Sequence, residues 1–214
     1  MGDWTLKLHL TLICGMSGSG KTTFAFRHLF NTGAACRFVF DHQGRDGPRI
    51  ASFVPGVQPC YTAAELEVAL ATRWVVFNPC RMFPGDMTFQ KAFAFFCQWV
   101  YDASRRAPGK KFFLVNEINQ LQDRENIPDQ LSQIVLAGRE ENIELVCCAQ
   151  EPHFVHSAIT GQSSELVCFR LDESRALRKI ESLGLSGSEV QALPLGSFIS
   201  LDRLQRTQIA GRVF

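Results

Sequence analysis

Short runs of apolar residues alternate along the chain with longer segments in which apolar residues recur every three or four positions. The short runs predict strands, at about 7–14, 37–41, 73–77, 112–115, 144–149 and 166–171. The longer segments predict helices, at about 21–30, 62–70, 89–103, 129–140 and 173–183, with a short one after Ser186. The segment 89–103 is the longest, and its apolar residues share one helical face that is expected to pack on a sheet.

Strands that alternate with helices are typical of a three-layer α/β fold around a mostly parallel sheet. The segments 198–201 and 208–214 are predicted to pair as a closing antiparallel hairpin. Residues 42–59 are predicted to be mostly loop, because glycine and proline are frequent there. There is no internal repeat and no evident linker, so a single domain over residues 1–214 is predicted.

Composition is that of an ordinary globular protein, with 46% hydrophobic and 20% charged residues and a formal net charge of +1. The balanced charge leaves any nucleic-acid contact to local basic patches. The 18 phenylalanines against 2 tyrosines predict a core rich in aromatic rings without hydroxyl groups. No run is long enough to span a membrane, and Lys7 and His9 interrupt any leader-like apolar stretch, so a soluble cytosolic protein is expected.

Eight cysteines raise the question of disulfides or a zinc site. No two of them have the C-x-x-C spacing of a zinc site. Four lie inside predicted strands, namely Cys14, Cys147, Cys148 and Cys168. Buried, reduced thiols are therefore the favoured interpretation.

A glycine-rich turn joins the first predicted strand to the first predicted helix. It matches G-x-x-x-x-G-K-[ST] in full, and its candidate nucleotide-binding residues are Gly15, Met16, Ser17, Gly18, Ser19, Gly20, Lys21, Thr22 and Thr23. Glycines let the backbone N–H groups turn inward and surround an anion at a helix N-terminus. Lys21 is expected to contact the β- and γ-phosphates, and the Thr22 hydroxyl to bind Mg²⁺. The motif predicts a P-loop nucleoside triphosphatase.

A second candidate site follows the strand at 112–115, which ends in Asn116 and Glu117. The last position of such a strand usually holds an aspartate in the magnesium shell. Here that position is Asn116, whose amide can hydrogen-bond a magnesium-bound water but adds no negative charge. Glu117 is the candidate general base for the attacking water. The alternative is that both residues are the polar end of a core strand.

Two further residues are candidates for the same reaction. Gln150 follows the strand at 144–149, and the carboxyl ends of parallel strands line the crevice where ligands bind. It is expected to reach the γ-phosphate or the water, unless it is a surface turn residue. Arg139 ends the preceding helix and is a candidate arginine finger for a neighbouring subunit, or a cation that favours the helix dipole.

Other polar residues are expected to have mainly structural roles. A metal site at His153 and His156 is disfavoured because no further ligand has suitable spacing. Asp41, after the strand at 37–41, either assists the metal or caps the next turn. Two basic groups are assigned to solvated surfaces rather than to DNA or to a kinase lid, namely Arg105, Arg106, Lys110 and Lys111, and Arg170, Arg175 and Arg178.

Taken in order, several segments resemble the HerA/FtsK superfamily. They are the glycine-rich turn, FVFDHQG after the second strand, VNEINQL, AGREENIELVCCAQEP and the late LPLGSFISL hairpin. Within that superfamily the chain resembles the small genome-packaging ATPases of double-jelly-roll viruses. The resemblance spans most of the chain. The glycine-rich turn alone is shared by many families, so the more specific signal is the ordered set of segments, with a glutamine closing the strand after VNEINQL.

The resemblance implies a RecA-like ATPase core that assembles into a ring, usually a hexamer, and moves DNA through it with ATP and Mg²⁺. It implies that Lys21 and Thr22 hold phosphates and metal, that Glu117 activates water, that Gln150 senses the γ-phosphate, and that Arg139 is the best candidate finger. Asn116 departs from the usual acid. The expected partners are a double-stranded viral genome and a capsid vertex or portal protein, in the host cytoplasm or at the packaging vertex.

Three other functions are left open by the residues. A morphogenesis ATPase of the filamentous-phage type has a similar core but normally a membrane anchor. A small-molecule kinase shares the phosphate-binding turn but rarely carries a glutamate at the position of Glu117, because the substrate hydroxyl replaces water. A nucleotide switch without turnover is compatible with Asn116.

Overall fold

The computed structural model describes residues 9–85, 89–122 and 124–214 and forms two compact units. The first contains the chain up to Thr32 together with residues 117–127 and 146–214. The second contains residues 33–116 and 128–145. Positions 7 and 8 of the first predicted strand lie outside the described residues.

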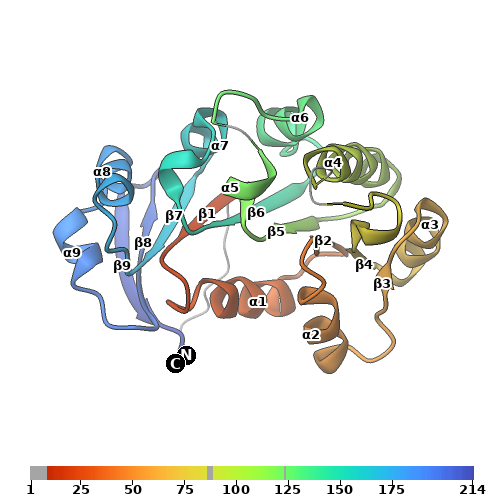
Figure 1. Ribbon diagram of the computed structural model, residues 1–214, viewed down its shortest axis with the longest axis horizontal. Helices are drawn as coiled ribbons and strands as arrows, with labels where there is room; N and C mark the ends of the chain where they lie inside the picture. The colour runs from red at the N-terminus through yellow and green to blue at the C-terminus, as the bar shows by residue number, and fades with distance from the viewer. Residues whose placement is uncertain (1–8, 86–88, 123) are drawn as a thin grey trace. The chain divides into compact units, whose positions relative to one another are not determined.

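The first unit is built on parallel strands extended by a hairpin (Figure 1). Its strands are β1 (Leu10–Cys14), β7 (Glu165–Phe169), β8 (Ser197–Asp202) and β9 (Thr207–Arg212). Its helices are α1 (Lys21–Asn31), α5 (Ile118–Leu121), α7 (Ser157–Gln162), α8 (Ser174–Ser182) and α9 (Gly187–Gln191), with a 3₁₀ turn η3 (Pro152–Phe154). β1 pairs in parallel with β7, whereas β7–β8 and β8–β9 pair antiparallel. The predicted C-terminal hairpin is therefore confirmed.

The second unit holds a parallel sheet in the order β3-β4-β2-β5. Its strands are β2 (Cys36–Phe40), β3 (Pro59–Cys60), β4 (Trp74–Phe77) and β5 (Lys111–Val115). Its helices are α2 (Asp46–Phe53), α3 (Ala63–Thr72), α4 (Phe89–Arg106) and α6 (Asp129–Ala137), with a 3₁₀ turn η1 (Pro79–Arg81). β6 (Ile143–Ala149) begins in this unit and ends in the first.

The predicted α/β class with a mostly parallel sheet is confirmed by these pairings. α1 and α7 both contact β1, and Figure 1 shows them on opposite sides of it. The strands are buried along their whole length in β1, β5, β6 and β7, as expected for parallel strands covered on both faces. A single domain over 1–214 stays a prediction.

Phenylalanine fills the core of the second unit, as the composition predicts. Its largest fully buried side chains are Phe38, Phe40, Phe77, Phe93, Phe96, Phe112 and Phe113. The Phe96 ring lies 5.1 Å from Phe77 and 5.7 Å from Phe113, centroid to centroid. α4 therefore packs on the sheet with the predicted face, although Phe89 at its start is only half-buried.

The prediction of a loop over residues 42–59 is wrong, because α2 occupies part of it. Asp41 is buried, and its carboxylate accepts hydrogen bonds from Arg45 N at 2.9 Å and Gly47 N at 2.8 Å. These bonds satisfy backbone donors at the start of the helix. Pro48 lies in the first turn, where a missing N–H costs little. Asp41 thus has the capping role that was one of its two interpretations.

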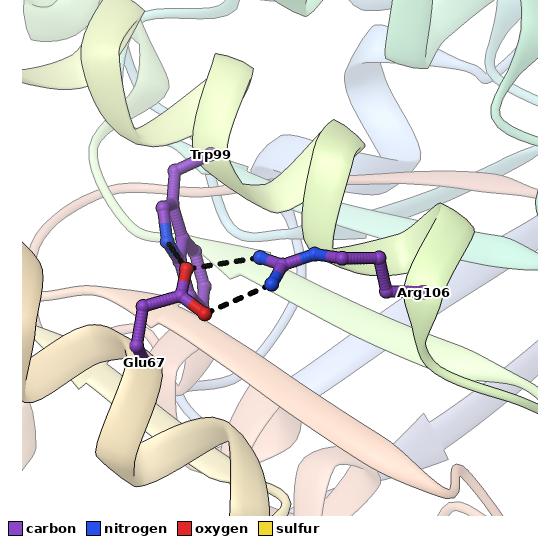
Figure 2. Close-up of polar contacts among 3 residues, drawn as sticks. All are labelled: Glu67, Trp99 and Arg106. Carbon is purple, nitrogen blue, oxygen red and sulfur yellow. Dashed lines mark hydrogen bonds and ion pairs between the residues drawn. The ribbon is translucent and has the colours of Figure 1, made fainter.

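The basic residues around the end of α4 are held by acidic and carbonyl oxygens. Glu67 on α3 accepts hydrogen bonds from Trp99 Nε1 at 2.8 Å and from both terminal nitrogens of Arg106 at 2.9 Å (Figure 2). Arg106 and Trp99 lower the pKa of the Glu67 carboxyl. Lys110 Nζ lies 2.6 Å from Glu144 Oε2, and Lys111 Nζ donates to Glu141 O at 3.0 Å. These basic side chains therefore form contacts within the protein.

Four of the cysteines lie where the sequence predicts. Cys14, Cys147, Cys148 and Cys168 are buried in β1, β6 and β7. Burial raises the pKa of Cys14 to about 12, so this side chain is a neutral thiol at physiological pH. Within the described residues, no helix is both long and apolar enough to cross a lipid bilayer.

Candidate nucleotide-binding site

The glycine-rich turn leaves β1 at Gly15 and enters α1 at Lys21. Gly18 and Gly20 have φ values of +72° and +115°, a region that side chains disfavour. A Cβ atom on Gly20 would lie 2.8 Å from Val213 Cγ2 and 3.0 Å from Phe169 Cε1. Glycine is therefore required at position 20 both by the backbone and by its neighbours.

Lys21 is buried inside the turn, with 6% of its surface exposed. Its Nζ donates to Met16 O at 2.9 Å, across the width of the turn. Burial lowers the pKa of Lys21, and Cys148, Glu117 and Cys14 act in the opposite direction. A partly desolvated cation beside backbone N–H groups is suited to phosphate, because an anion restores the stabilisation that burial removes.

Two hydroxyls complete the turn. Ser19 is 1% exposed, and among the described residues no partner reaches its Oγ. Thr22 is half-buried at the second position of α1. A phosphate would satisfy the buried Ser19 hydroxyl, and the Thr22 hydroxyl fits Mg²⁺, which takes few protein ligands when substrate phosphates supply the others. The described residues contain no group of three His, Cys, Asp or Glu side chains able to hold a metal.

The turn is braced by the C-terminal part of the chain. Met16 N donates to Arg170 O at 2.9 Å, and Gly196 N donates to Ser19 O at 3.1 Å. Gly196 O in turn accepts from Val213 N at 2.8 Å, which links the turn to the end of β9. The sequence contains no signal for these contacts, because the partners are more than 150 positions from the turn.

A cluster of aromatic side chains also packs the C-terminal part of the chain against α1. Phe24 on α1 lies 6.0 Å from Phe169 and 4.9 Å from Phe198, both with edge-to-face geometry. Phe169 and Phe198 lie 5.5 Å apart. Such pairs add to the burial of their apolar area. α1, β7 and β8 are therefore packed together directly beside the phosphate-binding turn.

Glu117 begins α5 and lies in the same unit as the turn. Its φ of 57° is in the left-handed region, which is uncommon for residues other than glycine. Strained backbone of this kind is concentrated at functional sites. The Glu117 carboxylate raises the pKa of Lys21, against the larger lowering effect of burial, so the two charges interact.

Two amides orient the Glu117 carboxylate. Gln150 Nε2 donates to Glu117 Oε1, and Gln120 Nε2 donates to Glu117 Oε2 at 3.2 Å. The structure thus brings together Glu117 and Gln150, which are 33 positions apart. Gln120 was not singled out from the sequence, although its spacing of three from Glu117 at the start of a helix was an available signal.

A third amide joins the segments that carry these two residues. Gln122 is 4% exposed, and its Nε2 donates to Phe154 O at 2.9 Å. Its Oε1 accepts from His156 N at 3.2 Å. The segment after Glu117 is therefore fixed to the segment after Gln150 at two points. The sequence carries no local signal for Gln122, because both its partners are backbone atoms more than 30 positions away.

Asn116 belongs to the second unit, where it contacts Asp46 on α2. Asn116 Nδ2 donates to Asp46 Oδ2 at 2.6 Å. Its Oδ1 is buried, and no donor among the described residues reaches it. Asp46 thus supplies a carboxylate beside the amide that replaces the usual acid. Asp46 was not a candidate from the sequence, because it lies 70 positions from Asn116.

The remaining candidates have separate surroundings. Arg139 is exposed, in the turn between α6 and β6 of the second unit. His153 Nδ1 lies 3.4 Å from Glu173 Oε2, and His156 Nδ1 accepts a hydrogen bond from Ala158 N. The two histidines therefore have structural roles at the starts of α8 and α7.

Comparison with known proteins yields similarity in structure and none in sequence. No protein-family model matches the sequence, and no curated protein matches it. Among solved structures, the chain is similar to the genome-packaging NTPase B204 of Sulfolobus turreted icosahedral virus 2 in complex with ATP-gammaS, with a TM-score of 0.76 and 14% identity over 97% of this chain and 98% of that one.

Two further structures are similar over most of this chain. VirB4 of Thermoanaerobacter pseudethanolicus has a TM-score of 0.69 and 11% identity, with coverage of 100% of this chain and 91% of that chain. The pCW3 conjugation coupling protein TcpA with ATPgS has a TM-score of 0.57 and 14% identity, with coverage of 97% and 61%. The resemblance to genome-packaging ATPases noted in the sequence is thereby confirmed at the level of the fold.

Proposed function

We propose that this protein is an ATP-hydrolysing DNA translocase and serves as a motor subunit that packages a viral genome. The observation that carries the proposal is the pairing of Glu117 with Gln150 in the unit that also holds the phosphate-binding turn. A turn that only bound phosphate would not need an oriented carboxylate at that place. Hydrolysis needs one, because water is a weak nucleophile until a base accepts its proton.

In this proposal each residue has a separate task. The backbone N–H groups of the turn and Lys21 hold the β- and γ-phosphates, and Glu117 accepts a proton from the water that attacks the γ-phosphorus. Gln150 orients Glu117 and detects the γ-phosphate. Thr22 would hold Mg²⁺, which would supply positive charge to the phosphate oxygens.

The translocase part of the proposal is supported by the structural neighbours. The proteins of similar fold include a viral genome-packaging NTPase and a conjugation coupling protein. Translocation along DNA suits a ring, so we propose a hexamer that encloses double-stranded DNA and docks at a capsid vertex or portal protein.

A ring also provides a role for Arg139. Its exposed position lets it reach the nucleotide of a neighbouring subunit, where a cation stabilises the charge that develops on the γ-phosphate. Neither Arg139→Ala nor Lys21→Ala subunits alone should turn over ATP, whereas a mixture of the two should recover part of the activity in steady-state phosphate release. A mixture that is inactive at every ratio would exclude a finger acting between subunits.

The proposed function is tested by the dependence of ATP hydrolysis on DNA. Phosphate release by the assembled protein should rise when duplex DNA is added, and the mass of the assembly should be measured under the same conditions. Turnover that is equal with and without DNA would contradict translocation. A kinase would instead transfer the γ-phosphate to a metabolite, and a switch would bind ATP without releasing phosphate.

A further inference from the structure

Two cations of the first unit, Lys179 and Arg203, meet at buried Thr160, and a third, Arg124, acts electrostatically on Lys179. Lys179 on α8 donates from Nζ to Thr160 Oγ1 at 3.3 Å. Arg203, in the turn between β8 and β9, donates from Nη1 to Thr160 O at 2.6 Å. Arg124, in the exposed loop after α5, lies close enough to act on the Lys179 ammonium.

The positions of two of these cations are fixed by the protein itself. Arg203 Nη1 also donates to Ser163 O at 2.8 Å and to Ser163 Oγ at 2.9 Å. These oxygens lie at the C-terminal end of α7, where the helix dipole favours a cation. Lys179 is half-buried and held at the same helix. The cluster is therefore a built structure rather than a set of mobile surface side chains.

Among the described residues, none of these three cations forms an ion pair with an acidic side chain. The oxygens that accept from Lys179 and Arg203 are all neutral. The pKa of Lys179 is lowered by burial first and then by Arg124 and Arg203, while Cys14 acts in the opposite direction. Like charges held this close to one another cost free energy until an anion binds.

The basic residues at the end of α4 provide the contrast. There Arg106 meets Glu67 and Lys110 meets Glu144, so the protein neutralises its own cations. Around Thr160, within the described residues, the hydrogen bonds of Lys179 and Arg203 go to neutral oxygens instead. Phosphate is the anion class that suits several converging guanidinium and ammonium donors.

The cluster is also connected to the candidate catalytic residue. Arg124 lies two positions after Gln122, whose amide is fixed to Phe154 and His156. Glu117 lies five positions before Gln122, at the other end of α5. An anion that holds Arg124 therefore acts on the same short segment that positions Glu117.

We propose that Arg124, Lys179 and Arg203 form a binding site for the phosphate backbone of duplex DNA. The inference rests on the proposed function, since it names where the translocated polymer contacts this chain. Contacts of this kind bind DNA without reading its sequence, and they weaken as salt rises because each one releases a counterion.

The test measures the affinity of a short fluorescent duplex by anisotropy at several salt concentrations. The variant is the double substitution Arg124→Gln and Lys179→Gln; Arg203 is left in place because it holds the end of α7. Loss of two phosphate contacts should lower the magnitude of the slope of log affinity against log salt by about 1.8 and weaken binding by roughly 10- to 100-fold near 0.1 M salt. The matched control is Arg27→Gln with Arg212→Gln, two exposed cations of the same unit.

The outcomes separate this site from the proposed function. If the parent protein binds duplex DNA and the Arg124/Lys179 variant binds it with the same affinity and salt slope, the site is excluded while the translocase remains. Equal losses in the variant and the control would show a general effect of charge and also exclude the site. If the parent protein fails to bind duplex DNA even at low salt, the proposed function and this site both fail. Thermal melting of each variant checks that it is folded.

Discussion

Replacing Glu117 with glutamine is expected to lower the rate of ATP hydrolysis by about 100- to 10,000-fold, the usual contribution of a general base. A glutamine has nearly the same size, but its amide cannot accept the proton of the attacking water. It also presents an NH₂ group to Gln150 or Gln120, both of which now donate to the carboxylate. Nucleotide affinity should be kept, because the phosphate-binding turn is untouched.

The measurement is single-turnover phosphate release together with the retention of labelled ATP. Glu125→Gln is the matched control, since it removes an exposed carboxylate of the same unit and should leave the rate within a few-fold of the parent. A Glu117→Gln protein that hydrolyses ATP at a rate close to that of the parent would show that another group activates water. In that case the hydrolytic part of the proposed function would have to be reassigned.

Replacing Lys21 with methionine is expected to weaken ATP binding by roughly 10- to 100-fold, because hydrogen bonds to charged groups contribute about 1.5–3 kcal/mol each. The unliganded protein should keep its melting temperature or gain a little. Burial lowers the pKa of Lys21, which means that the charged amine is disfavoured in the folded protein. Methionine fills similar space without that cost, although the bond to Met16 O is lost.

Thermal melting with and without ATP separates the two effects, because a ligand that binds only the folded state raises the melting temperature according to its affinity. The parent should show a clear rise on adding ATP, and Lys21→Met should show little or none. Arg27→Met, on the exposed face of α1, serves as the control and should respond to ATP as the parent does. A normal response in Lys21→Met would contradict the assignment of the turn as the phosphate site.

Much of the fold could be predicted from local patterns, since the buried strands and long helices have strong periodicity. α4 is the clearest case, with an apolar stripe that reaches the sheet along most of its length. α3 begins beside its predicted start at residue 62, where Thr62 and Glu65 form a capping box in which each side chain bonds the other's backbone. α2 was not predicted, because residues 42–59 are rich in glycine and proline. The start of the helix is stabilised by the carboxylate of Asp41, which lies outside the helix and is buried.

The candidate site likewise contains some features that local sequence reveals and others that it does not. The turn at Gly15 and the acid at Glu117 are recognisable because phosphate binding and proton transfer need those residue types next to particular elements. The contacts of Gln122 and the Asn116–Asp46 pair were not recognisable. Each joins groups that are distant in the chain, and a glutamine or an aspartate is ordinary in any loop or helix.

Local sequence is enough to locate the glycine-rich turn, because only glycine readily adopts the positive φ values that let backbone N–H groups surround an anion. It is also enough to locate the buried strands, because long apolar runs are stable only away from water. The orientation of Glu117 by Gln150 and Gln120, and the contact of the turn with the C-terminal hairpin through Gly196, come from the folded chain alone. The same is true of the meeting of Lys179 and Arg203 at Thr160. Hydrogen bonds and charge interactions depend on distance through space, and residues far apart in the sequence become neighbours only when the chain folds.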